Sequence, residues 1–116
     1  MALDMTTEQR EITGMVRDFV EREIIPVAHE LDHDDVYPQD IVRHMKQLGF
    51  FGFAISEQYG GAGLDYATYA MVCEEIARGW MSITGIINTH FIVSYLIESF
   101  GTDEQKQRFL PKMATG

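Results

Sequence analysis

The sequence is poor in basic residues, and this limits the ligands that the chain can bind. It has 9 Lys and Arg against 18 Asp and Glu, which gives a formal net charge of −9. Nucleic acids and anionic membrane surfaces are both bound through clusters of Lys and Arg. We therefore expect no nucleic-acid partner and no membrane partner. By the same argument, this chain alone is not expected to hold a large phosphate-bearing nucleotide.

Cysteine is almost absent as well. The one cysteine, Cys73, has no partner for an internal disulfide, so we expect a reducing compartment and predict a cytoplasmic location. It lies in an apolar stretch, where we interpret it as a packed core residue rather than a nucleophile. Residues 1–4 lead directly into a helix signal, so we expect no secretory signal. No run of about 18 apolar residues predicts a membrane-spanning helix.

Apolar residues make up 46% of the 116 residues, and their spacing is typical of helices. Thr6 and Gln9 fit a capping box that opens a first helix. Pro26 predicts that this helix ends or kinks at Ile25, with another turn or two over residues 27–32. Its apolar face is formed by Ile12, Met15, Val16, Phe19, Val20 and Ile24.

Two further helices follow from similar signals. Pro38 suits the first turn of a second helix, for which Gly49 is placed as the residue just past its end. Asp65 is placed to cap a third helix, which Gly79 ends. The apolar segment 50–55 fits either a buried connection or a short strand. The second helix is expected to bury Ile41, Val42, Met45 and Leu48.

The fourth helix is the most apolar part of the chain. We expect Ser82 to cap it and residues 83–100 to be surrounded by protein on most sides. Thr102 and Gln105 form a second capping box, which opens a final helix that Pro111 stops or kinks. These signals predict an all-α fold, with about five helices in one orthogonal, bundle-like domain over the whole chain.

The residues themselves also contain one pattern that is typical of a zinc site. His29 and His33 enclose Glu30 in an H-E-x-x-H pattern, which on a helix places two zinc ligands on one face. Asp32 and the polar residues after it favour a solvated helix end instead, so we assign no metal ligand. A third zinc ligand would have to come from Glu57, Glu74 or His90.

Two other polar patterns are interpreted as structural. The glycines of residues 60–63 are not followed by the Lys and the Ser or Thr of a phosphate-binding loop, so they predict a tight connection. Glu74 and Glu75 are adjacent, so on a helix they point about 100° apart and do not share a site. One of the two is expected at a rim and the other in solvent.

Asn88, Thr89 and His90 place polar groups on the most apolar helix. Burial of a polar group costs free energy unless the group finds a hydrogen-bond partner. Two interpretations therefore stay open. These groups are hydrogen-bonded inside the core, or the helix lines a ligand cavity.

Five short motifs occur in a fixed order along the chain. They are PVAHELD at 26–32, LGFFG at 48–52, ISEQYGGAG at 55–63, EEIAR at 74–78 and GTDEQKQRFLP at 101–111. Together they resemble the N-terminal helical domain of the acyl-CoA dehydrogenase family, with the last motif the most specific. Ser56 stands where that family commonly has proline.

The resemblance implies part of an FAD-dependent enzyme of fatty acid metabolism that catalyses α,β-dehydrogenation of an acyl-CoA thioester. The family's middle β-domain and C-terminal helical domain, which hold most of the FAD and supply the base, are expected to be absent from this chain. We therefore assign no catalytic and no cofactor-binding residue, and expect the chain alone to be inactive. Electron-transfer flavoprotein as acceptor and a homo-oligomeric full-length protein are implied as well.

The resemblance also implies that the helix of residues 82–100 lines the acyl cavity. By that match, the substrate-binding residues are Ile87, Asn88, Phe91 and Tyr95. Because Phe91 and Tyr95 are bulky, they predict a short or branched acyl group.

Two alternatives to a dehydrogenase remain open. The first is a related flavoprotein of the same fold, such as an acyl-CoA oxidase, a nitroalkane oxidase or a flavin-dependent monooxygenase. The second is a non-enzymatic helical module that binds a protein partner. Apolar surface exposed on the domain is consistent with either an enzyme part or such a module.

Overall fold

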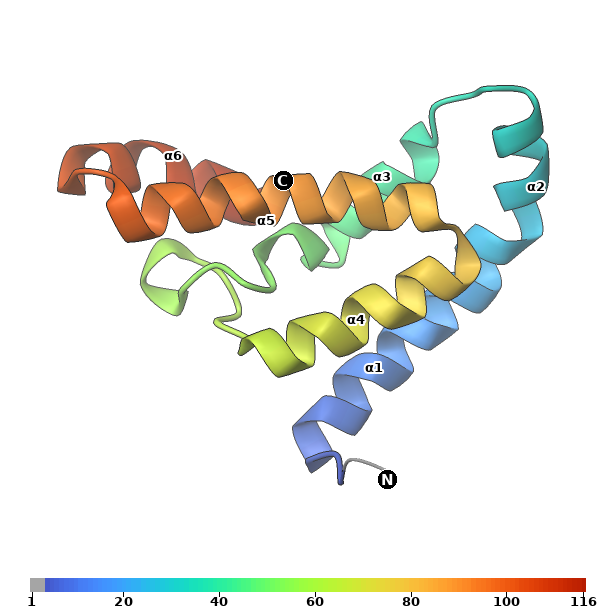
Figure 1. Cartoon of the computed structure of the whole chain (residues 1–116), viewed down its shortest axis with the longest axis horizontal. Helices are drawn as coiled ribbons and strands as arrows, with labels where there is room; N and C mark the ends of the chain where they lie inside the picture. Colours follow the sequence, from blue (N-terminus) through green and yellow to red (C-terminus); the bar gives the residue numbers. More distant parts are fainter. Residues whose placement is uncertain (1–3) are drawn as a thin grey trace.

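All regular structure in the computed structural model, which describes residues 4–116, is helical (Figure 1). A π-helical turn, Val20–Ile24, joins the first two α-helices into one continuous helical segment, so the predicted all-α fold of about five helices is confirmed. The expectation that there is no secretory signal rests on residues 1–4, and of these residues 1–3 lie outside the described part of the chain. The elements are α1 (Thr7–Phe19), α2 (Ile25–His33), α3 (Gln39–Gln47), α4 (Tyr66–Gly79), α5 (Met81–Phe100) and α6 (Asp103–Thr115), with 3₁₀ turns at Phe50–Gly52 and Glu57–Tyr59.

The helix ends that the sequence predicts from local chemistry are confirmed. Thr6 and Gln9 form the expected capping box, in which each side chain bonds the other residue's backbone N–H, at 3.1 and 3.0 Å. The same box opens α6. Asp65 caps α4 by accepting from the Thr68 N–H at 2.8 Å. Gly49 ends α3 with a positive φ of 79°, a conformation that glycine adopts without strain.

The helical segment of α1 and α2 continues through Pro26, where the sequence predicts an end or a kink. The Ile25 N–H donates to the Val20 carbonyl, five residues back, which is the pattern of a π-turn. The wider turn makes room for the proline ring, and Pro26 then occupies the first turn of α2, where a missing N–H costs little. The predicted break is therefore a π-turn just before the proline.

Ser82 is not the cap of α5, contrary to the prediction. The helix begins at Met81, and the Ile83 N–H already donates to the Trp80 carbonyl at 3.1 Å. Gly79 ends α4 as predicted, so only Trp80 separates the two helices. The link is too short to place the α5 cap as late as Ser82.

Pro111 does not stop α6, so of the two outcomes that the sequence predicts there, a stop or a kink, the stop is wrong. The helix continues through the proline to Thr115. Leu110 and Ala114, four residues apart on one face, are both buried. This packing holds the helix together across the backbone hydrogen bond that the proline cannot make.

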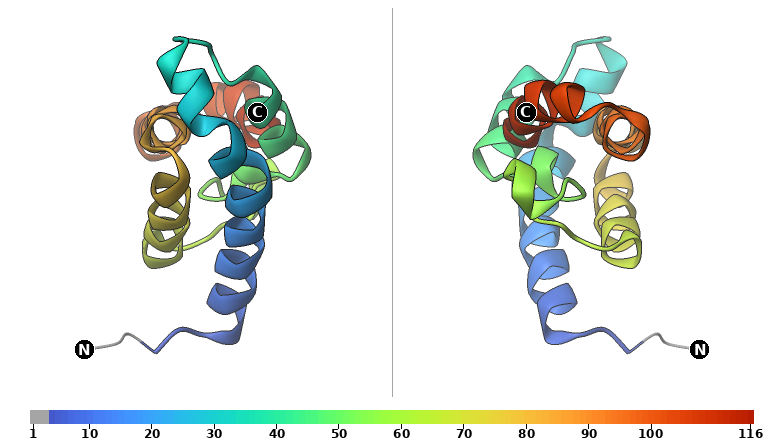
Figure 2. Two further views of the ribbon diagram at one scale, coloured as in Figure 1. Left: turned by 90° about the vertical axis from the view of Figure 1, so that its right-hand side faces the viewer. Right: turned by 90° about the vertical axis from the view of Figure 1, so that its left-hand side faces the viewer.

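Helices α1 and α4 lie side by side and run in the same direction (Figure 2). They approach so closely at the end of α4 that a Cβ on Gly79 would lie 2.6 Å from Cγ1 of Val20. Three close approaches follow one another in the same order along α4 and along α1 and the π-turn after it: Gln9 with Thr68, Arg17 with Glu75, and Val20 with Gly79.

The core lies where α1, α4, α5 and α6 meet the segment 50–59. Phe50 is fully buried and packs against Phe19 and Phe53, with ring centroids 5.1 and 4.9 Å apart. Two residues placed on buried faces by the sequence are exposed instead, namely Met15 (41%) and Leu48 (48%). Leu48 is the residue just past the last turn of α3, where the chain leaves the helix for the left-handed turn at Gly49.

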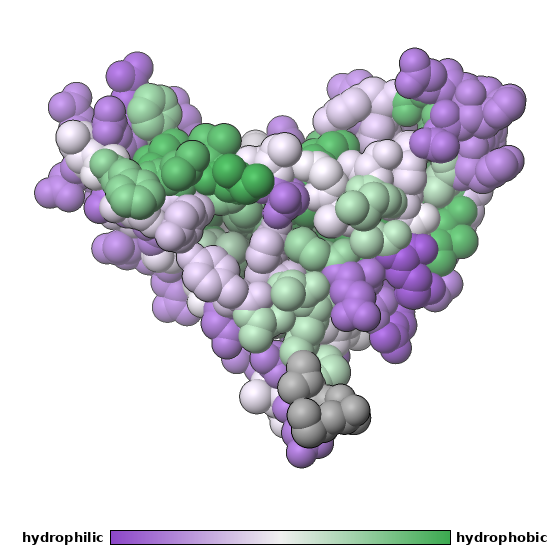
Figure 3. All heavy atoms as spheres, in the orientation of Figure 1, coloured by the Kyte–Doolittle hydropathy of each residue, from purple (hydrophilic) through white to green (hydrophobic). Residues whose placement is uncertain are grey.

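Helix α5 is not surrounded by protein within this chain, so that prediction is wrong. It packs against α4 and α6 on one side. Its other face leaves apolar side chains in solvent, with Phe100 78% exposed and Ile92 and Leu96 50% exposed. Figure 3 shows hydrophobic residues gathered at the upper left of the molecule, where the C-terminal half of α5 lies in Figure 1. No helix within residues 4–116 has both the length and the apolar character needed to cross a bilayer.

Residues 50–55 form a buried connection rather than a strand, and the segment 50–64 as a whole folds back on itself, with no strand among its described residues. The carbonyl of Ile55 accepts from the Gly63 N–H at 2.9 Å, and that of Gly52 accepts from the Ala62 N–H at 2.8 Å. Gly61 lies inside this fold, where a Cβ would be 2.0 Å from the Ile55 carbonyl oxygen. The loop therefore closes only because residue 61 has no side chain.

Of the two adjacent glutamates, Glu74 is exposed, as expected for one of them, whereas Glu75 is buried between α1 and α4. Arg17 donates to its carboxylate from Nε at 3.1 Å and also from a terminal nitrogen. Arg78 lies 3.4 Å away and pairs with Glu21 at 2.8 Å. The hydrogen bonds from Arg17 hold the pKa of Glu75 below its ordinary value, although burial acts in the opposite direction.

We expect Gly61→Ala to lower the free energy of unfolding by more than about 2 kcal/mol, because the new Cβ meets backbone atoms that cannot move aside. Gly14→Ala is the matched control, since a Cβ at Gly14 in α1 meets nothing within 4 Å. Removing a glycine from a helix interior there should raise stability by about 0.5–1 kcal/mol. Urea unfolding measures both, and equal effects would contradict the packing at Gly61.

We expect Glu75→Gln to cost about 1–3 kcal/mol at pH 7, because Arg17 loses a charged acceptor. A carboxyl whose pKa is lowered by folding stabilises the folded state above its unfolded pKa, about 4.3, and this contribution is lost as the pH falls through the lower folded pKa. The difference between wild type and variant should therefore shrink as the pH falls below about 5.

Glu74→Gln is the matched control for this experiment. It removes the same charge from the neighbouring residue, which is exposed and forms none of the ion pairs found in residues 4–116. Its effect on the free energy of unfolding should stay within about 0.5 kcal/mol at every pH. A Glu75 effect that did not depend on pH would show that shape, rather than charge, matters at this position.

Candidate functional site

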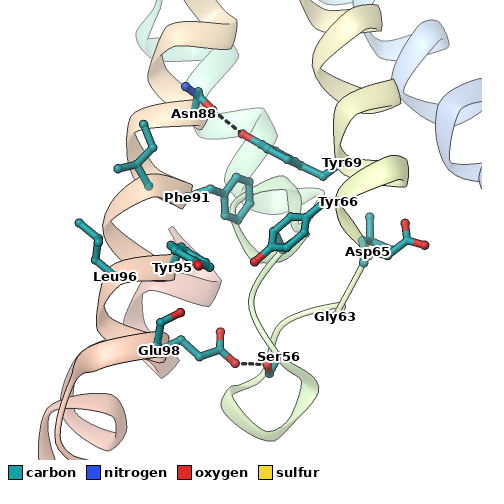
Figure 4. A pocket seen from close by; sticks show the side chains of 14 residues that line it. Ser56, Gly63, Asp65, Tyr66, Tyr69, Asn88, Phe91, Tyr95, Leu96 and Glu98 are labelled. Carbon is teal, nitrogen blue, oxygen red and sulfur yellow. Dashed lines mark hydrogen bonds between the residues drawn. The ribbon is translucent and has the colours of Figure 1, made fainter.

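A pocket of about 830 Å³ opens where α5 passes the start of α4 and the loop before it (Figure 4). The α5 residues that line it follow helical spacing, so they lie on one face of that helix. They are Asn88, Phe91, Ile92, Tyr95, Leu96, Glu98 and Ser99. The opposite wall consists of Ala54, Ser56, Gly63, Leu64, Asp65, Tyr66 and Tyr69.

Aromatic rings form much of the wall. Tyr69 and Phe91 pack edge to face, with centroids 5.0 Å apart, and they connect α4 to α5. Tyr66 and Tyr95 repeat this arrangement at 6.2 Å, nearer the solvent. Such a surface suits an apolar or aromatic ligand group, because edge-to-face pairs are stable and leave ring faces available.

Two hydrogen bonds cross the pocket, one near each end of the stretch of α5 that lines it (Figure 4). The Tyr69 hydroxyl donates to Oδ1 of Asn88 at 3.1 Å, and burial raises the pKa of that hydroxyl, which keeps it a neutral donor. The Ser56 hydroxyl donates to the carboxylate of Glu98. Ten residues of helix separate Asn88 from Glu98, a rise of about 15 Å.

The charge of the pocket is entirely negative among its lining residues. Asp65 and Glu98 contribute carboxylates, and the lining contains no Lys, Arg or His. Asp65 is engaged as the cap of α4, where the hydrogen bonds from Thr68 lower the pKa of its carboxyl. Glu98 is therefore the acid available to a ligand.

A family model described as the acyl-CoA dehydrogenase N-terminal domain matches residues 6–116. The chain belongs to the acyl-CoA dehydrogenase family. The match starts at the cap of α1 and includes every element of the fold. The resemblance in the five sequence motifs is thereby confirmed for essentially the whole chain.

Relatives with assigned activities cover this chain almost completely. It is 37% identical over its full length to a short-chain specific acyl-CoA dehydrogenase of Clostridium acetobutylicum. It is 42% identical over 95% of its length to a 3-(aryl)acrylate reductase of Clostridium sporogenes. A glutaryl-CoA dehydrogenase solved as its glutaryl-CoA complex shares 34% identity with a TM-score of 0.90, over 99% of this chain. The chain spans about 30% of the length of each.

Of the four residues assigned to acyl binding from the family resemblance, three line the pocket and one does not. Asn88, Phe91 and Tyr95 face it, although Phe91 is only 4% exposed. Ile87 is fully buried in the core on another side of α5. Adjacent residues of a helix diverge by about 100°, so Ile87 and Asn88 do not share a wall.

The other residues of the lining were not predicted from the sequence, and four of them show which signals were present or missing. Glu98 follows Tyr95 by three residues, so helical spacing alone could have found it. Tyr66 and Ser56 carry no such signal, because their place depends on how the loop folds back onto α5. The fourth is Leu96, half exposed at the pocket edge.

The polar residues of α5 divide between the two interpretations that the sequence left open. Asn88 is exposed and lines the pocket. Thr89 is also exposed and bonds the carbonyls of its own helix at 3.0 Å. His90 is half-buried away from the pocket and donates from Nε2 to the Phe51 carbonyl at 2.8 Å, and burial lowers its pKa.

The histidines of the zinc alternative lie on the exposed surface of α2. The rings of His29 and His33 stack with centroids 6.4 Å apart. Within residues 4–116, no group of three or more His, Cys, Asp or Glu side chains is placed to hold a metal ion. Cys73 is half-buried in α4 rather than fully packed, and burial raises the pKa of its thiol, which disfavours the reactive thiolate.

The division between core and pocket wall on α5 can be tested by stability. We expect Ile87→Ala to lower the free energy of unfolding by about 2–5 kcal/mol, because it leaves a cavity in the core. Tyr95→Ala should cost less than about 1 kcal/mol, since that ring is 49% exposed. Urea denaturation compares the two, and an equal loss at Tyr95 would assign its ring to the core.

Proposed function

We propose that this chain is the N-terminal helical domain of an FAD-dependent acyl-CoA dehydrogenase, and that its pocket forms one wall of the acyl-binding site. The observation that carries the proposal is the aromatic pocket on α5 in a chain that matches the family over residues 6–116. Asn88, Phe91 and Tyr95 are the proposed acyl contacts. Ile87 supports them from the core side of the same helix.

The described residues do not fit the diphosphate of FAD. The pocket offers no Lys or Arg to phosphate oxygens, and it presents the carboxylates of Asp65 and Glu98 instead. The positive φ of Gly60 and Gly63 serves the folding of the loop rather than an anion site. We therefore propose that FAD is held mainly by the family's other two domains, and that no catalytic residue lies in this chain.

The role left to these residues is to exclude water from the acyl group and to orient it. Phe91 is fixed by Tyr69, which is itself tied to Asn88 across the pocket, so this part of the wall is rigid before a ligand arrives. A preformed apolar wall reduces the entropy lost on binding and lowers the local dielectric around the reacting carbons. The bulk of Phe91 and Tyr95 supports a short or branched acyl group.

The apolar face of α5 supports the proposal that this chain works as part of a larger enzyme. Ile92, Leu96 and Phe100 expose large apolar side chains that a partner domain would cover. Electron-transfer flavoprotein as acceptor, a homo-oligomeric enzyme, a role in fatty acid metabolism and a cytoplasmic location are proposed with it. The acceptor, the assembly and the pathway rest on the family resemblance, and the location rests on the isolated Cys73.

A second candidate function is the reverse reaction, reduction of an α,β-unsaturated acyl group that carries an aromatic ring. The relative with 42% identity is a 3-(aryl)acrylate reductase. The observation in favour is the aromatic wall, since Tyr66, Tyr69, Phe91 and Tyr95 can pack against an aryl ring. An oxidase or monooxygenase of the same fold shares the pocket and differs in its reaction with oxygen.

The test is a visible absorption spectrum of the protein made from its complete gene. We expect flavin bands that bleach without oxygen when a short-chain acyl-CoA is added and do not bleach with free CoA, the matched control. Bands that bleach only with a chemical reductant and return with an arylacrylate would support the reductase instead. If the protein made from the complete gene contained no flavin, both candidate functions would be overturned and the helical interaction module would be favoured.

A further inference from the structure

The pocket carries a negative charge that nothing in its lining balances. Glu98 projects from α5 toward the loop, and its carboxylate is held there by the Ser56 hydroxyl (Figure 4). The other acid of the lining, Asp65, is committed to the α4 cap. The arginines described above, Arg17 and Arg78, pair with acids on the π-turn and on α4, and neither of them lines the pocket.

We propose that Glu98 is a specificity-determining residue, which makes this pocket select against ligands with an anionic end and accept uncharged or cationic ones. The proposal deepens the function proposed above and rests on it, because it takes the pocket to be the acyl wall. An anionic end group that enters the pocket finds no cation on the wall that this chain supplies, loses water and meets the Glu98 carboxylate. Acyl groups that end in a carboxylate are therefore disfavoured.

Ser56 is the positioning residue for this charge. A free glutamate side chain on a helix surface turns toward water, where its charge is well screened. The hydrogen bond from Ser56, 42 residues earlier in the chain, holds the Glu98 carboxylate at the end of the pocket instead. The loop that carries Ser56 is fixed by its own backbone hydrogen bonds, so the carboxylate has a defined place.

The aromatic rings also favour cationic ligand groups over neutral ones and neutral groups over anionic ones. Tyr66 and Tyr95 lie at the open side of the pocket, with centroids 6.2 Å apart and ring surface exposed to solvent. Ring faces attract cations within about 6 Å of the centroid and repel anions. A cationic group is thus attracted by both Glu98 and the rings, a neutral group packs against the rings alone, and an anion is opposed by both.

The experiment titrates the chain with three probes of nearly equal shape and measures binding from the changes in backbone NMR chemical shifts. The probes are 3-phenylpropylamine, 3-phenylpropanamide and 3-phenylpropanoate at pH 7. We expect the anion to bind about tenfold more weakly than the amide, and the amine at least as well as the amide. The shifts should change along the stretch of α5 that lines the pocket and around Tyr66 and Tyr69.

Glu98→Gln keeps the size of the side chain and removes its charge, so the anion should then bind within about threefold of the amide. Glu30→Gln is the matched control, because it makes the same change in net charge on α2, outside the pocket. This control should leave the ratio between amide and anion binding as it is in the wild type. Ser56→Ala should give an intermediate ratio, while Ser56→Thr, which keeps a hydroxyl, should retain the wild-type ratio.

Three results would overturn the inference, in distinguishable ways. Equal binding of all three probes to wild type would remove the charge selection and leave the pocket as a ligand site. Discrimination that survives Glu98→Gln would assign the selection to another residue. Failure of every probe to bind would remove the pocket as an acyl wall together with the inference, whereas the family's flavin chemistry is decided separately by the absorption spectrum.

Discussion

The pocket depends on a backbone contact that leaves no room for a side chain. Gly61 lies against the carbonyl of Ile55, and around this point the loop closes through hydrogen bonds between backbone groups alone. Backbone pairs of this kind hold a fixed geometry with few adjustable torsions. The loop presents Ser56 and Asp65 to the pocket, so their positions follow from the closure at Gly61. The loop residues of the site are therefore held in place by backbone hydrogen bonds, as residues of a helix are.

Helix α5 serves the core and the pocket at the same time. Ile87 lies wholly in the core, Asn88 faces the pocket, and Phe91 does both, because its ring is buried while it forms part of the wall. A helix with one face in the core usually has a polar opposite face. The apolar outer residues of α5 depart from that rule, and a covering partner domain would account for the departure.

What the sequence predicts well is what a few neighbouring residues decide. The two capping boxes, the Asp65 cap and the positive φ of Gly49 all depend on chemistry within three or four residues. The stop predicted at Pro111 fails for a different reason. Pro111 is tolerated because Leu110 and Ala114 are anchored by the rest of the fold, which no local signal contains. The same limit applies to the site, since Ser56 meets Glu98 across 42 residues of chain.

The acidity of the chain and the chemistry of its family become compatible once recognition is divided between domains. A CoA thioester and FAD are both rich in phosphate, and a chain of net charge −9 repels them at long range. That repulsion matters little if this domain meets only the uncharged end of the ligand. It then becomes useful, because a negative wall without counter-ions distinguishes acyl ends by charge, where an apolar wall distinguishes them only by size. The lack of basic residues in the lining is thus a condition for the selectivity at Glu98.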